Sequence, residues 1–155
     1  MYKKIMVPLD GSKLAECVLP HVDSLVKGGQ VGEVVFVRIV EPYNFTLISE
    51  ERPPKAEEII RFDAEARAEG EKYVRAVAER GKSNGVSVKG EVLVGNPSVK
   101  LAEFANDGGF DLVMIATHGR SGPSRWVWGS VADRLLRAVC VPILMVRAPG
   151  CVPGI

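Results

Sequence analysis

Apolar residues in this chain gather either in short continuous runs or in longer segments where they recur every three to four positions. The short runs lie between turn-forming residues, as is typical of buried strands, and occupy residues 4–9, 33–40, 110–116 and 141–147. Residues 86–94 instead alternate between apolar and polar residues, which also predicts a strand. The recurring pattern predicts amphipathic helices within residues 14–25, 56–82, 97–104 and 130–138. The chain therefore alternates strand and helix and ends on a strand.

This alternation predicts an α/β fold, a doubly wound parallel sheet of five strands with helices on both faces. We expect the strand order 3-2-1-4-5, a single domain over residues 1–148 and a short tail over residues 149–155. Ligands of such sheets bind beyond the carboxyl ends of the strands, where the strand order reverses. Asp10 follows the first strand and residues 116–131 follow the fourth, so both should line one crevice.

Several residues predict local features of the helices. Ser12 and Asn96 should cap the first and third helices, and Pro97 suits a first helical position. Pro20 lies inside the first helical segment and predicts a kink or a missing hydrogen bond there. The long segment 56–82 has a charged face that we interpret as solvated. Its opposite side is expected to be buried and carries Ile59, Ile60, Ala66, Tyr73, Val74 and Val77.

Composition narrows the function without identifying it. An apolar share of 46% and a net charge of +1 are those of an ordinary globular domain, with no basic excess for nucleic acid. No apolar run approaches the roughly 20 residues of a membrane span, and no signal peptide is visible, so we expect a cytoplasmic protein. The cysteines are too scattered for a disulfide framework or metal site, and Cys17 and Cys140 are expected to be buried apolar residues.

The segment 116–131, ATHGRSGPSRWVWGSV, joins the fourth strand to the fourth helix and resembles a phosphate cradle. Its glycines allow backbone N–H groups to approach an anion, and the helix N-terminus adds a favourable dipole. It matches neither the P-loop pattern nor GxGxxG. Trp126 and Trp128 within it would pack the loop onto the domain or a dimer contact, or would cover a ligand.

Several residues in or near this region could bind a ligand or could have a purely structural role. Ser130 could donate to phosphate or could form a capping box with Asp133. Asp10 could contact a ligand or could serve only as a turn residue before Gly11. His118 has no visible carboxylate partner and is more simply a hydrogen-bonded loop residue than a catalytic one. Arg120 and Arg125 could pair with phosphate or remain solvated.

Several motifs together resemble the universal stress protein family, in particular its ATP-binding branch. They are KKIMVPLDGS at the start, the Gly95-Asn96-Pro97 turn, DLVMIATHGRSG, GSVADR and the closing VPILMVR. The family pattern G-x2-G-x9-G-[ST] is present except at its first position, where Ala116 replaces glycine. An added methyl group matters there only if the residue needs positive φ or a very close backbone approach.

The resemblance implies the fold of the adenine-nucleotide alpha-hydrolases and a site for ATP, ADP or AMP. Asp10, beside Pro8 and Leu9, would take the ribose hydroxyls, and Ile39 would lie against the adenine. Phosphates held mainly by backbone N–H groups would carry the Mg²⁺. The full set of implied binding residues is Pro8, Leu9, Asp10, Ile39, Ile115, Ala116, His118, Gly119, Arg120, Gly129, Ser130 and Val131.

The family resemblance also implies a homodimer formed through the last strand, Val141 to Arg147, which is an apolar sheet edge. Two function classes follow, a nucleotide-dependent signalling switch and a slow ATPase. The switch is favoured because no general base and no P-loop lysine are visible beside the cradle. A family member that binds no nucleotide and acts through protein contacts is the remaining alternative, and Ala116 is the one residue that favours it.

Overall fold

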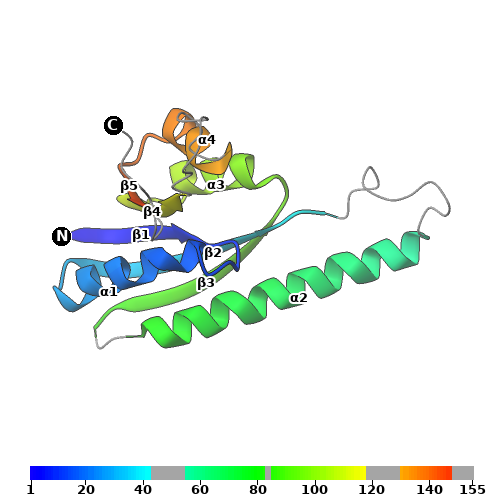
Figure 1. Cartoon of the computed structure of the whole chain (residues 1–155), viewed down its shortest axis with the longest axis horizontal. Coiled ribbons are helices and arrows are strands. Elements are labelled where there is room, and N and C mark those ends of the chain that lie inside the picture. Colours follow the sequence, from blue (N-terminus) through cyan, green and yellow to red (C-terminus); the bar gives the residue numbers. More distant parts are fainter. Residues whose placement is uncertain (43–54, 83–84, 118–129, 148–155) are drawn as a thin grey trace.

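A five-stranded parallel sheet with the order β3-β2-β1-β4-β5 forms the centre of the computed structural model (Figure 1). The structure describes residues 1–42, 55–82, 85–117 and 130–147. The strands are β1 (Tyr2–Pro8), β2 (Val31–Val40), β3 (Ser87–Val94), β4 (Leu112–Thr117) and β5 (Ile143–Arg147). The expected strand order and parallel direction are both confirmed.

Two helical layers cover the two faces of the sheet. The helical elements are the 3₁₀ turn η1 (Ala15–Val18) and the helices α1 (Leu19–Lys27), α2 (Ala56–Gly81), α3 (Pro97–Asp107) and α4 (Ser130–Ala138). Figure 1 shows α1 and α2 below the sheet and α3 and α4 above it. Helices on both faces of a parallel sheet are the arrangement that the alternation of strands and helices predicts.

Alternating side chains of β1 divide between two hydrophobic cores. Ile5 and Val7 belong to the core beneath α1 and α2, whereas Met6 belongs to the core beneath α3 and α4. All three side chains have no exposed surface. A central strand buried on both faces reads as a continuous apolar run, which is why β1 shows no polar alternation in the sequence.

The first helical segment begins as a 3₁₀ turn and continues directly as an α-helix, where the sequence predicted one helix. Ser12 Oγ accepts a 3.0 Å hydrogen bond from the Ala15 N–H at the start of the 3₁₀ turn η1. Ser12 is nevertheless not the predicted cap, because the N-cap residues are Leu14 for η1 and Val18 for α1. Pro20 then lies in the first turn of α1. An N–H there has no partner inside the helix, so proline fits without breaking a bond. Pro20 therefore does not lie in the interior of the α-helix as expected, and neither the predicted kink nor the predicted loss of a helical hydrogen bond follows from it.

Asn96 caps α3 as expected. Its side-chain oxygen accepts hydrogen bonds from the Ser98 and Val99 N–H groups at 3.1 and 3.3 Å, and Pro97 is the first helical residue. The helix runs to Asp107, three residues past the predicted end at residue 104.

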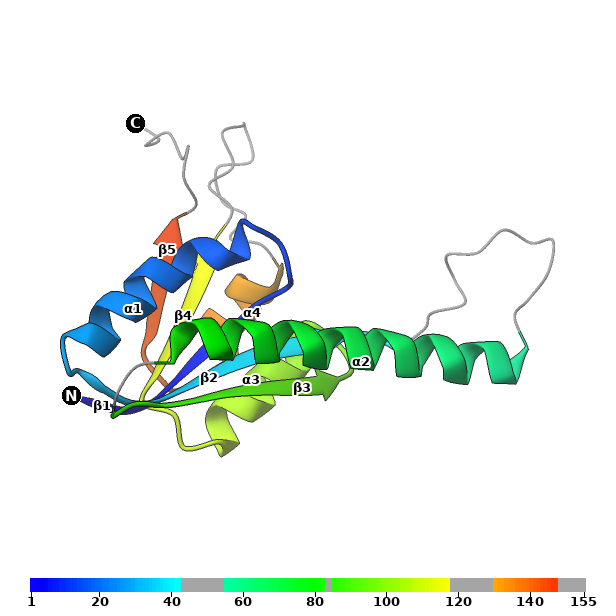
Figure 2. The same cartoon turned by 90° about the horizontal axis from the view of Figure 1, so that it is seen from below.

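Only the second half of α2 packs on the sheet. Its buried residues are Gly70, Val74, Val77 and Ala78, all in that half. Ile60 has 69% of its surface exposed, so the expectation that it is buried is wrong. Figure 2 shows the reason, since the first half of α2 extends beyond the end of the sheet. Periodicity identifies the apolar side of a helix but not how far its partner sheet reaches.

The two described cysteines differ in environment. Cys17 is half-buried against the core beneath α1 and α2, whereas Cys140 is exposed, which corrects the expectation that it is buried. The Cys140 N–H donates to the Asn106 side chain at 3.1 Å, and Asn106 donates to the Ala138 carbonyl at 2.9 Å. Asn106 thus fixes the chain after α4. Across the described residues, no helix is long and apolar enough to cross a bilayer.

Candidate functional site

Strands β1 and β4 separate at their carboxyl ends. The two strands pair at Ile5 with Leu112 and at Met6 with Val113, and within the described strands this register goes no further. On its other side, β1 remains paired with β2 as far as Pro8 and Val37. The strand order reverses between β1 and β4, so the gap opens at the position where doubly wound sheets bind ligands.

A cleft of about 290 Å³ opens there, near the lower end of the roughly 300–1,000 Å³ of ligand pockets. Residues from the carboxyl ends of β1, β2 and β4 meet residues from η1 and from the first turns of α3 and α4. The lining consists of Pro8, Leu9, Asp10, Ala15, Val37, Ile39, Glu41, Pro97, Leu101, Ile115, Ala116, Thr117, Val131 and Ala132.

Seven of the candidate residues from the sequence lie together in this cleft. They are Pro8, Leu9, Asp10, Ile39, Ile115, Ala116 and Val131. Ser130 is the first residue of α4 and precedes the lining residue Val131. The remaining candidates lie outside the described residues, and they are His118, Gly119, Arg120, Arg125 and Gly129. Both tryptophans, Trp126 and Trp128, also lie outside them.

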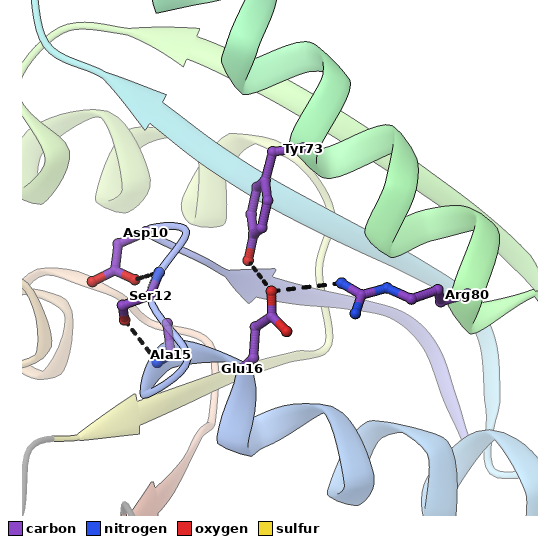
Figure 3. Close-up of polar contacts among 6 residues, drawn as sticks. All are labelled: Asp10, Ser12, Ala15, Glu16, Tyr73 and Arg80. Carbon is purple, nitrogen blue, oxygen red and sulfur yellow. Dashed lines mark hydrogen bonds and ion pairs between the residues drawn. The ribbon is translucent and has the colours of Figure 1, made fainter.

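Asp10 forms a turn and also faces the cleft. Its Oδ1 accepts a 2.8 Å hydrogen bond from the Ser12 N–H across Gly11, whose φ of 84° suits glycine (Figure 3). Burial alone would raise the pKa of this carboxyl, but the hydrogen bonds from Ser12 and the charge of Arg38 bring it below its ordinary value. The carboxylate is therefore ionised at neutral pH. The turn role and the ligand role of Asp10 are compatible.

Ala116 causes no backbone strain at the first position of the glycine pattern. It lies in β4, where it pairs with Val146 of β5. Every described non-glycine residue has negative φ, including Ala116. The methyl group of Ala116 would matter if the residue needed positive φ or a very close backbone approach. The first of these conditions does not apply.

Sequence reasoning missed half of the cleft lining. Glu41 directly follows β2, and Thr117 is the last residue of β4. Both could have been predicted from the sequence, because they lie at the ends of strands that the sequence identifies. Leu101 and Ala132 come from helices, and their place in the cleft depends on how α3 and α4 pack. No sequence pattern distinguishes such residues from ordinary core residues.

The charge distribution in the described part of the cleft is uneven. Among the described lining residues the charged ones are Asp10 and Glu41, both acidic. This part suits neutral hydroxyl and N–H groups, which donate to carboxylates, better than it suits an anion. The first turn of α4 enters the cleft at Val131 and Ala132, and a helix N-terminus favours negative charge. The described residues include no cluster of three or more His, Cys, Asp or Glu that could hold a metal.

Comparison with known proteins gives consistent matches over almost the whole chain. The model of the universal stress protein family matches residues 1–147. A universal stress protein of Methanocaldococcus jannaschii is 29% identical over 96% of this chain and 84% of its own length. A universal stress protein solved in complex with cAMP superposes with a TM-score of 0.68 at 20% identity, covering 95% of this chain and 98% of its own. A family protein of Arabidopsis thaliana with AMP bound gives a TM-score of 0.61 at 11% identity, covering 96% and 93% of the two chains.

Proposed function

The chain belongs to the universal stress protein family, and on that premise we propose that it binds an adenine nucleotide in the cleft between β1 and β4. The proposal depends mainly on one observation. The cleft presents an ionised carboxylate, Asp10, on one wall and the N-terminal turn of α4 on the other. A nucleotide has the matching chemistry, with neutral hydroxyl groups at the sugar and negative charge at the phosphate.

The nucleoside would occupy the described part of the cleft. The carboxylate of Asp10 would accept hydrogen bonds from the ribose hydroxyls. Ile39, at the end of β2, would lie against the adenine, where backbone groups can recognise the base. Ile115 and Ala116 would form the floor. Apolar walls with a few polar groups at fixed positions are typical of small-molecule sites.

The phosphates would lie at the N-terminus of α4. Backbone N–H groups of Gly119, Gly129 and Val131 and the hydroxyl of Ser130 would donate to phosphate oxygens. His118 and Arg120 belong to the same proposed set. Because the described residues offer no metal-binding cluster, Mg²⁺ would be carried mainly by phosphate oxygens.

The two solved family members named above carry AMP and cAMP, and both support an adenine ligand of this class. We propose a signalling role rather than an enzymatic one, in which the bound nucleotide alters the surface of a homodimer. The dimer would form along β5, an edge strand of the sheet whose Leu144 is 42% exposed. Sedimentation at high micromolar concentration should then give twice the monomer mass, and a monomer there would contradict the dimer.

Isothermal titration calorimetry with adenosine, AMP and ATP tests the site directly. We expect all three to bind wild-type protein, and Asp10→Asn to weaken each of them because the asparagine amide is a poorer acceptor for hydroxyl groups. Ser130→Ala should lower the affinity for AMP and ATP while leaving the affinity for adenosine unchanged. Asp23→Asn is the matched control, since Asp23 is exposed on α1 and does not line the cleft.

Three outcomes separate the alternatives. Heat with nucleotides and no ADP release over hours supports the switch. Release of ADP at a steady rate supports the slow ATPase. No heat with any of the three ligands removes both and leaves a family member that acts through protein contacts alone.

A further inference from the structure

Arg38 lies between the loop that carries Asp10 and the helix α2. It follows Val37 and precedes Ile39, which both face the core beneath α3 and α4, so alternation along β2 directs Arg38 to the opposite face. The side chain is half-buried there. None of the sequence motifs discussed above includes it.

Arg38 lies next to two glycines from different elements. A methyl group placed on Gly11 would lie 3.5 Å from Nη1 and 3.7 Å from Cζ of Arg38, so the guanidinium packs directly against the β1–η1 loop. A methyl group on Gly70 of α2 would lie 3.5 Å from Arg38 Cγ, so the aliphatic part packs against the helix. Arg38 thus contacts the loop with its charged end and the helix with its apolar part.

Polar side chains of η1 and α2 are paired next to the loop that carries Asp10. Tyr73 of α2 donates a 3.0 Å hydrogen bond to Glu16 Oε1, and Arg80 lies 3.5 Å from the same oxygen (Figure 3). Burial, followed by the contact with Glu16, raises the pKa of Tyr73, while the charge of Asp10 raises it further and that of Arg38 lowers it. Asp10, Arg38 and Tyr73 therefore all lie within electrostatic range of one another.

We propose that Arg38 is a positioning residue for Asp10, holding the β1–η1 loop against α2 so that the Asp10 carboxylate faces the ribose side of the cleft. This inference rests on the proposed nucleotide site and adds a residue outside it. Arg38 does not line the cleft, so it acts on a ligand only through Asp10. Its guanidinium contributes both packing against Gly11 and a charge that favours the ionised carboxylate.

Several groups from neighbouring elements surround Asp10, and a titration of its carboxyl would report their combined effect on its pKa. Ser12 donates to it within the loop, Arg38 faces it from β2, Tyr73 is in electrostatic range from α2, and Glu41 lines the same cleft from the end of β2. Arg38 is the cation among the groups that shift the Asp10 pKa. Its removal should therefore raise that pKa.

The experiment compares Arg38→Gln with Arg38→Lys and with Arg75→Gln as matched control, since Arg75 is an exposed residue of α2 that does not line the cleft. The Asp10 carboxyl is titrated by NMR in the ligand-free protein, and binding of adenosine and of 2′,3′-dideoxyadenosine is measured by calorimetry. Both ligands are uncharged, so a general loss of positive charge does not alter their affinity. We expect Arg38→Gln to raise the Asp10 pKa and to lower the affinity for adenosine roughly threefold to tenfold. The affinity for dideoxyadenosine should stay unchanged.

Arg38→Lys keeps the charge and should retain a low Asp10 pKa, and Arg75→Gln should leave the Asp10 pKa and the adenosine affinity at their wild-type values. An unchanged Asp10 pKa in Arg38→Gln, or equal weakening of both nucleosides, would overturn the inference and reduce Arg38 to a packing residue. Failure of wild-type protein to bind adenosine is a different result, because it overturns the nucleotide proposal while the titration still decides whether Arg38 controls the carboxylate.

Discussion

The Tyr73 hydroxyl of α2 donates a 3.0 Å hydrogen bond to Glu16 of η1, although the two residues are 57 positions apart in the chain. Both side chains are half-buried, and the contact lies next to the turn that carries Asp10 (Figure 3). Glu16 thereby joins the long helix to the loop at the mouth of the cleft. The packing of α2 and the geometry of the candidate site are therefore connected.

Tyr73→Phe tests this contact. Removing the hydroxyl should lower the free energy of unfolding by about 1–2 kcal/mol at neutral pH, because a hydrogen bond to a charged group is lost. The raised pKa of Tyr73 stabilises the folded state below the ordinary tyrosine pKa of 10.0, and this contribution is lost as the pH rises above it. Urea unfolding of wild-type protein should show that loss above about pH 10, and Tyr73→Phe should not show it. Tyr2→Phe, at an exposed residue of β1, is the control.

Adenosine affinity should vary little with pH down to about pH 4. The pKa of Asp10 is held below its ordinary value of 3.8, so the carboxylate stays ionised until the pH falls below that value. A series of calorimetric titrations between about pH 7 and pH 4 measures this. The Asp10→Asn variant should bind adenosine weakly, and with the same affinity at every pH of the series. A wild-type affinity that already declines between about pH 6 and pH 5 would contradict the assignment of Asp10.

Gly90→Ala should destabilise the protein by about 1–3 kcal/mol. A methyl group on Gly90 of β3 would lie 2.8–2.9 Å from side-chain and backbone atoms of Val74 in α2, so the helix would have to move off the sheet. Chemical denaturation gives the loss. Gly81→Ala is the matched control, since its added methyl would make an ordinary 3.4 Å contact with Phe36, and should change stability by less than about 1 kcal/mol.

Two substitutions along α2 should have unequal costs. Val77 is 1% exposed, and Val77→Ala should lower the free energy of unfolding by about 2 kcal/mol through lost burial and a residual cavity. Ile60 is 69% exposed, and Ile60→Ala should stay within about 0.5 kcal/mol of wild type. Equal losses in thermal or urea unfolding would mean that the first half of α2 is covered in solution.

The sequence by itself determined the layout of this protein. Apolar or alternating segments bounded by turn residues located all five strands. The central strand β1 is apolar because it is buried on both faces, whereas β3 and β5 lie at the sheet edges and are partly exposed. Asn96 marked the start of α3 through its local capping bonds. The family motifs also located seven residues of the cleft, since these lie where strands end and the chain must turn. All of these signals are local in the chain.

Only the tertiary structure decided what depends on distant segments meeting. The exposure of Ile60 follows from where the sheet ends beneath α2. The placing of Pro20 in a first helical turn follows from the preceding 3₁₀ turn, which helical periodicity does not distinguish from an α-helix. The place of Leu101 and Ala132 in the cleft depends on how two helices pack. Arg38 packs near both Gly11 and Gly70, which are 59 residues apart in the chain. A sequence pattern describes each segment alone, whereas burial and charge pairing belong to pairs of segments.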